Sequence, residues 1–90
     1  MFSLEDWAFS AYDAERLARV VEGKAQENPK NTNLVARAKS YREEAEERWN
    51  DFWGGDKKYI DLSKKLMSDG GTFDDLMALV DKRDSAPFAN

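Results

Sequence analysis

The chain has neither cysteine nor histidine among its 90 residues. Disulfide scaffolds, zinc fingers, thiol nucleophiles and Ser-His-Asp triads are therefore excluded, and so is the commonest metal ligand in proteins. Paired carboxylates remain, but a di-iron site in a helical bundle also needs histidine. The sequence predicts a protein that is not an enzyme and that has no cofactor and no metal.

Long apolar runs are also missing. No stretch approaches the roughly 20 apolar residues of a membrane-spanning helix. The first six residues, Met-Phe-Ser-Leu-Glu-Asp, have neither the basic region nor the apolar run of a signal peptide. We therefore expect no membrane association and a cytoplasmic location, which would be the host cytoplasm if a phage encodes the protein.

No strong charge of one sign builds up along the sequence. The 14 basic and 18 acidic residues give a net charge of −4, and the segments 1–28, 29–53 and 54–90 carry −3, 0 and −1. A nucleic-acid-binding protein normally shows a basic patch or stripe. The charge totals thus argue against nucleic acid as a partner.

Apolar residues make up 41% of the chain and aromatic residues 12%, which is enough to build a hydrophobic core. Ninety residues correspond to one modest domain. We predict a single helical domain over residues 1–84, followed by a flexible tail at 85–90.

The first helix has a clear start signal and a clear stop signal. Ser3 and Asp6 have the spacing of a capping box, and Pro29 disfavours helix in the residue before it. Apolar residues recur between them at spacings of three and four, which places them on one face. They are Leu4, Trp7, Ala11, Ala14, Ala18, Val21 and Ala25.

A second long helix should be capped by Asn31 or Thr32 and should end at Gly54 and Gly55. Its apolar face consists of Leu34, Ala38, Tyr41, Ala45, Trp49 and Phe52. Because the connecting turn is short, the two helices should pair antiparallel, and facing residues then have numbers that sum to about 59.

Two shorter helices are predicted after this hairpin. One is capped by Asp56 and runs to Ser68, and the other opens with a capping box of Thr72 and Asp75. The predicted fold is therefore all-α: an antiparallel helical hairpin of two long helices, with two short C-terminal helices packed at its open end.

Some apolar surface is left over in this arrangement. The first helix has a second apolar row, Phe9, Leu17 and Val20, on the side away from its partner, and Trp49 and Trp53 gather at the open end. These five residues either belong to the core under the short helices or form a binding surface. We predict them as contact residues for another protein, and the row on the first helix is also a candidate surface for a homodimer.

Lysines form a stripe on the third helix, at Lys57, Lys58, Lys64 and Lys65. Such a stripe could bind a phosphate or another anion. Asp61 lies in its middle, and an amphipathic helix needs a polar face in any case. The competing interpretation is a solvated helix face.

Three functional hypotheses follow. The first is a small acidic protein-binding module, either an adaptor or a stoichiometric inhibitor of the kind that phages and mobile elements direct at host or defence machinery. The second is an oligomer that sequesters a nucleotide or another phosphorylated ligand at the lysine stripe. The third is a purely structural homo-oligomer.

Overall fold

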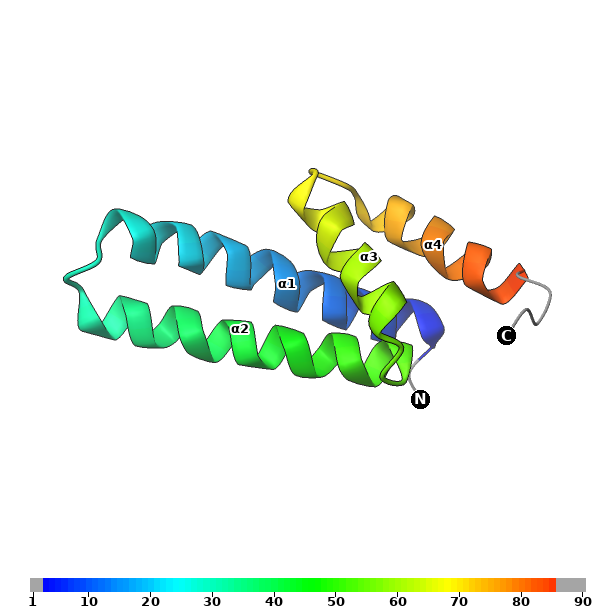
Figure 1. Cartoon of the computed structure of the whole chain (residues 1–90), viewed down its shortest axis with the longest axis horizontal. Helices are drawn as coiled ribbons and strands as arrows, with labels where there is room; N and C mark the ends of the chain where they lie inside the picture. The colour runs from blue at the N-terminus through cyan, green and yellow to red at the C-terminus, as the bar shows by residue number, and fades with distance from the viewer. Residues whose placement is uncertain (1–2, 86–90) are drawn as a thin grey trace.

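The computed structural model describes residues 3–85, which fold into four α-helices. Helix α1 spans Leu4–Glu27 and α2 spans Thr32–Trp53, and these two form a long antiparallel hairpin. Helix α3 (Lys57–Ser68) crosses the hairpin near its open end, and α4 (Phe73–Ser85) packs on α3 and α1 (Figure 1). The predicted all-α fold is confirmed. Ser85, predicted to begin the tail, closes α4, and residues 86–90 lie outside the described range.

Capping boxes open two of the helices at the predicted residues. At α1, Asp6 N donates to Ser3 Oγ at 3.1 Å, and Ser3 N donates to the Asp6 carboxylate at 3.3 Å. At α4, Thr72 and Asp75 make the same reciprocal pair at 2.8 and 3.2 Å. Both helix starts are thus encoded locally, because each pair satisfies two backbone donors that the helix leaves free.

The other two helices begin differently. Asn31 is the cap of α2, and its side chain accepts from Leu34 N at 3.1 Å. Asp56 occupies the cap position of α3 but makes no capping hydrogen bond. Its carboxylate lies 3.7 Å from the guanidinium of Arg83 instead, so this residue links the start of α3 to α4.

Small residues dominate the contact between α1 and α2. Ala14 and Ala18 of α1 cluster with Ala45 of α2, and Tyr41 packs against them, which are the neighbours that the predicted register requires. Alanine has no side chain beyond Cβ, so the two helix axes can approach closely. Within residues 3–85, the buried alanines are Ala8, Ala11, Ala14, Ala18, Ala38 and Ala45.

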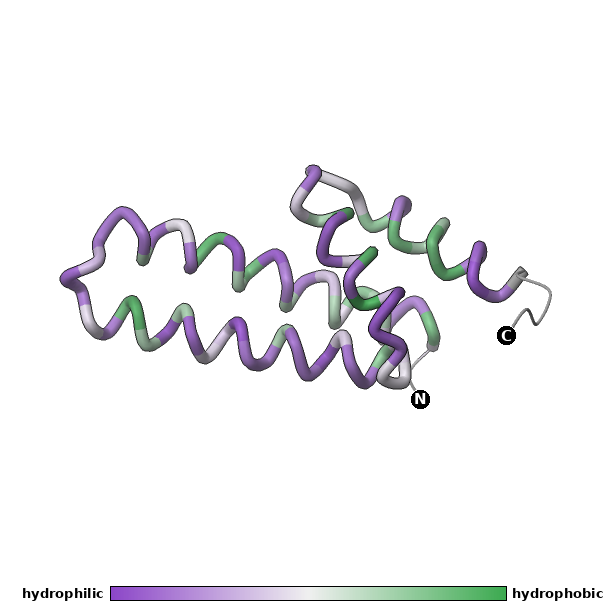
Figure 2. Tube along the Cα trace, in the orientation of Figure 1, coloured by the Kyte–Doolittle hydropathy of each residue, from purple (hydrophilic) through white to green (hydrophobic). Residues whose placement is uncertain are grey.

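The larger part of the core lies at the open end. Trp49 and Trp53 of α2 are buried there against Leu76 and Val80 of α4, with the small Ala8 of α1 among them. Apolar and hydrophilic segments alternate along the four helices, as amphipathic packing requires (Figure 2). The two short helices thus complete a core that the hairpin cannot close alone.

The predicted apolar face of α1 is wrong at its first turn. Leu4 and Trp7 were placed in the interface with α2, but they are 50% and 53% exposed. In the predicted register Leu4 faces Gly55, which lies in the glycine turn after the end of α2 at Trp53. The register sets Phe52 opposite Trp7, and Phe52 packs against the core cluster that contains Trp49 and Trp53.

Across residues 3–85, no helix combines the length and the apolar character needed to cross a bilayer.

Candidate functional site

A buried carboxylate lies in the middle of the hairpin. Glu15 of α1 is fully buried, and its two oxygens accept hydrogen bonds from Arg42 of α2 at 2.7 and 3.1 Å. Oε1 also accepts from Trp49 Nε1 at 2.9 Å. Arg19 Nε lies 2.7 Å from Oε2 as an ion pair, without the alignment of a hydrogen bond. A buried charge is tolerated here because both of its oxygens are paired.

The same network continues outward to α3. Arg42 donates two further hydrogen bonds of 2.8 Å to Glu22, and it also pairs with Glu46 at 3.4 Å. Glu46 in turn pairs with Lys64 of α3, whose carbonyl oxygen accepts from Arg19 at 3.0 Å. One connected set of charges therefore joins α1, α2 and α3.

The protonation equilibria of this network favour the charged forms. Burial by itself raises the pKa of Glu15, but the hydrogen bonds from Arg42 and Trp49 and the two arginine charges outweigh it, so the pKa lies below the ordinary value. The hydrogen bond from Arg42 likewise lowers the pKa of Glu22. The pKa of Arg42 is raised, mainly by its hydrogen bond to Glu22 and against the effect of burial. All three groups are thus ionised near neutral pH.

This network has the character of a structural clamp. Glu15 is fully buried and both of its oxygens already accept hydrogen bonds, so the carboxylate is not accessible to a ligand. The sequence did hold a signal for it, because Glu15 stands three residues before Ala18 on the face of α1 that pairs with α2. An acid at such a position, with Arg42 nearly opposite in the register, indicates a buried ion pair.

Trp49 and Trp53 are corrected from contact residues to core residues. Their exposed fractions are 0% and 2%, so neither offers surface to a partner. The indole of Trp49 donates to Glu15, and that of Trp53 donates to Ser63 Oγ at 2.8 Å. Both amphipathic side chains therefore satisfy their polar atom inside the protein.

The second apolar row of α1 is only partly covered. Phe9 is 51% exposed, although its ring packs edge-on against Phe73 of α4 with centroids 5.5 Å apart. Val20 is 46% exposed, and Leu17 is partly buried. Asp13 and Arg16, which lie between Phe9 and Val20, form an ion pair of 2.7 Å. Helices α3 and α4 thus leave much of the outer face of α1 open.

The lysine stripe of α3 is largely neutralised by neighbouring carboxylates. Lys57 and Lys65 pair with acids one turn further along the chain, Asp61 at 3.6 Å and Asp69 at 3.3 Å. The ammonium of Lys58 lies 5.7 Å from the centre of the Tyr59 ring. With Lys64 bound to Glu46, the stripe is a poor match for a site that concentrates positive charge on an anion.

The folded chain separates its charges in a way that the linear sequence hides. Residues 16–43, the half of the hairpin next to the α1–α2 turn, carry seven bases and three acids, a net charge of +4. The remaining residues, with the open end and the two short helices, carry seven bases and fifteen acids, a net charge of −8. Each long helix runs through both halves. A net charge counted over a whole helix therefore combines the basic and the acidic half and hides the difference between them.

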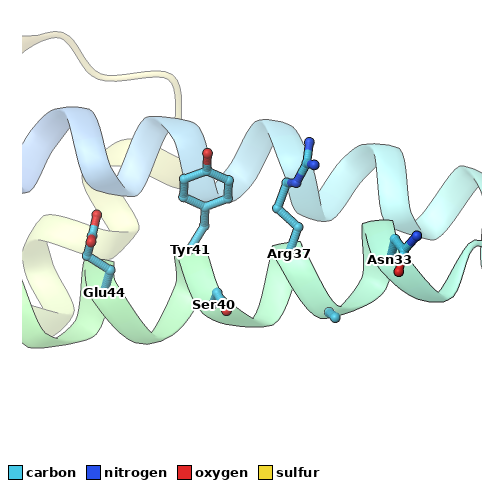
Figure 3. Close-up of a pocket in the computed structure, with 6 residues that line it drawn as sticks. Asn33, Arg37, Ser40, Tyr41 and Glu44 are labelled. Carbon is cyan, nitrogen blue, oxygen red and sulfur yellow. The ribbon is translucent and has the colours of Figure 1, made fainter.

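A shallow hollow lies on the side of α2. It is lined by Asn33, Ala36, Arg37, Ser40, Tyr41 and Glu44. Figure 3 shows Tyr41 and Arg37 reaching from α2 alongside α1, with Glu44 and Asn33 at the two ends of the row. All the lining residues come from one helix, whereas binding pockets usually gather polar groups from several elements. The hollow is therefore a surface irregularity of α2 rather than a candidate binding pocket.

No protein-family model, curated protein or solved structure matches the chain. Within the described part of the chain, no group of three or more metal-ligating side chains lies close enough together to hold a metal ion.

Proposed function

We propose that the protein acts by binding another protein, as an adaptor or a stoichiometric inhibitor, and that its acidic open end is the binding surface. The observation that carries this proposal is the half-exposed Trp7 in the acidic half of the molecule. Whether a phage or mobile element encodes the protein stays a prediction.

Trp7 is suited to anchor a protein partner. It is 53% exposed, and Leu4, one helical turn before it on the same face, is 50% exposed. Among the described residues, its indole nitrogen has no hydrogen-bond partner, unlike the indole nitrogens of Trp49 and Trp53. Tryptophan is enriched among the residues that dominate binding energy, because it buries a large rigid surface and keeps one polar atom for a specific contact.

The charge around Trp7 indicates the chemistry of the partner. Glu5 and Asp6 precede it on α1, and Asp51 stands near the end of α2, all three exposed to solvent. The fifteen acids of this half outnumber its seven bases. A partner surface with an apolar cleft and a basic rim is complementary to it, and the opposite charges would accelerate association at low salt.

The test is affinity capture with matched variants. The full chain is immobilised and exposed to a lysate of the organism that encodes it, beside Trp7→Ala and Val35→Ala. Val35 is also an exposed apolar residue, at 43%, but it lies on α2 in the basic half. We expect one protein to be retained by the wild type and by Val35→Ala, lost with Trp7→Ala, and bound less at high salt. Equal retention by all three would refute the assignment of the surface.

The other two hypotheses keep less support. A nucleotide-sequestering protein would need unpaired cations on α3, whereas Lys57, Lys64 and Lys65 each pair with a carboxylate. A thermal shift with millimolar nucleotides would revive that hypothesis. The structural homo-oligomer would give a stable higher mass in solution with no affinity for other proteins.

A further inference from the structure

The outer face of α1 carries a row of four residues at positions 9, 13, 16 and 20. At 3.6 residues per turn these positions fall within about 60° of one another, on the side of the helix turned away from α2. Phe9 and Val20 are 51% and 46% exposed, and the side chains of Asp13 and Arg16 are 35% and 52% exposed. We name these four residues the outer row.

The outer row is its own complement when it is read backwards. From the N-terminal side its order is apolar, acid, base, apolar, and from the other side it is apolar, base, acid, apolar. Both directions have the same spacings of four, three and four. Two copies of α1 laid antiparallel therefore match wherever the paired residue numbers sum to 29.

From this symmetry we infer that a second copy of the chain docks on the outer row, with the two α1 helices antiparallel about a two-fold axis. Phe9 of each copy then meets the second copy's Val20. Asp13 of each copy meets the second copy's Arg16. The contact closes on itself, because the same patch serves on both sides.

The charges favour this occupant over an unrelated protein. Asp13 and Arg16 already pair within one chain at 2.7 Å. In the dimer the four side chains form a ring of alternating sign, in which each charge gains a second partner. The antiparallel arrangement also sets the acidic half of each copy beside the basic half of its neighbour.

A single helix face gives a small contact, so the dimer should be weak and dependent on concentration. Sedimentation equilibrium of the full chain from about 10 µM to 1 mM measures it. We expect the mass to rise from 10.3 kDa toward twice that value. Val20→Asp should remain monomeric, whereas Val35→Asp, at the matched exposed position on α2, should dimerise like the wild type.

Charge reversal and mixing give the sharper test. Asp13→Arg and Arg16→Asp place like charges across the two-fold axis, so each variant should be monomeric alone. Both residues are solvent-accessible and pair with each other, so both variants should remain helical by circular dichroism. An equimolar mixture restores the match of opposite charges, and the mass should double again.

Three results would overturn the inference: a wild type that is monomeric at 1 mM, a dimer indifferent to Val20→Asp and to both reversals, or a mixture of the two reversals that does not recover. The surface is separate from the proposed partner site. Trp7→Ala should therefore leave self-association unchanged, so this inference and the proposed function can fail independently.

Discussion

Arg42 of α2 holds the fully buried carboxylate of Glu15 of α1 through two hydrogen bonds, of 2.7 and 3.1 Å. The pairing of the two long helices thus rests on a specific charged contact as well as on alanine packing. A shift of one helix along the other by a single turn would leave Glu15 unpaired in the interior. Since an unpaired buried charge is very unfavourable, the contact selects one register.

Glu15→Gln should destabilise the protein by about 3 kcal/mol, because it leaves Arg42 and Arg19 without their buried counter-charge. The measurement is urea unfolding followed by circular dichroism. Glu44→Gln is the matched control, since Glu44 and its partner Arg48 are both about half exposed. The control should change the free energy of unfolding by less than about 0.5 kcal/mol. Equal effects of the two substitutions would contradict a clamp role for Glu15.

The network also predicts how stability depends on pH. The pKa values of Glu15 and Glu22 are lowered in the folded protein from an ordinary 4.5, so the unfolded chain binds more protons in acid. The stabilisation is present in full above the ordinary pKa and is lost as the pH falls through the folded-state values. The free energy of unfolding should fall below about pH 4.5, and Glu15→Gln should flatten that fall. An unchanged acid slope in the variant would mean that Glu15 does not contribute to it.

Ser63→Ala should lower the free energy of unfolding by about 1–2 kcal/mol, because it strips the buried Trp53 indole of its acceptor. Ser63 itself donates to the Tyr59 carbonyl at 2.8 Å, so the serine fixes the ring against α3. Ser40→Ala, at an exposed mid-helix position on α2, controls for the higher helix propensity of alanine. Thermal unfolding of both variants measures the difference, and a Ser63→Ala protein as stable as the control would count against this contact.

Trp7 should dominate the quenching of the protein's fluorescence by acrylamide, because the other two tryptophans are buried. Trp7→Phe should remove most of the quenchable signal. Trp49→Phe keeps Trp7 and serves as the control, with most of the quenching retained. If Trp7→Phe leaves quenching unchanged, Trp7 is covered in solution and cannot anchor a partner.

The helices were predictable because their signals are local. Ser3 with Asp6 and Thr72 with Asp75 satisfy backbone donors within one turn, so neighbouring residues suffice to place the helix starts. The register was predictable as well, since the short turn between the two long helices determines which residues of their apolar faces lie opposite one another. Ala14 and Ala18 do meet Ala45 in the structure.

The candidate surface was less predictable, because exposure depends on where neighbouring elements end. Trp7 has the periodicity of a core residue, yet it is 53% exposed in the structure, near the end of α2 at Trp53. Trp53 was predicted as a contact residue, but in the structure it is buried because of where α3 and α4 lie. The separation of charge was missed for a related reason, because its boundaries at residues 16 and 43 fall in the middle of the two long helices rather than at their ends.

The most direct test of the proposed function is photo-crosslinking in living cells with a photoreactive amino acid at position 7 or at position 35. Both positions are about half exposed, but Trp7 lies in the acidic half and Val35 in the basic half. We predict one specific adduct with another protein from position 7 and none from position 35. The same adduct from both positions, or no adduct from either, would contradict the account.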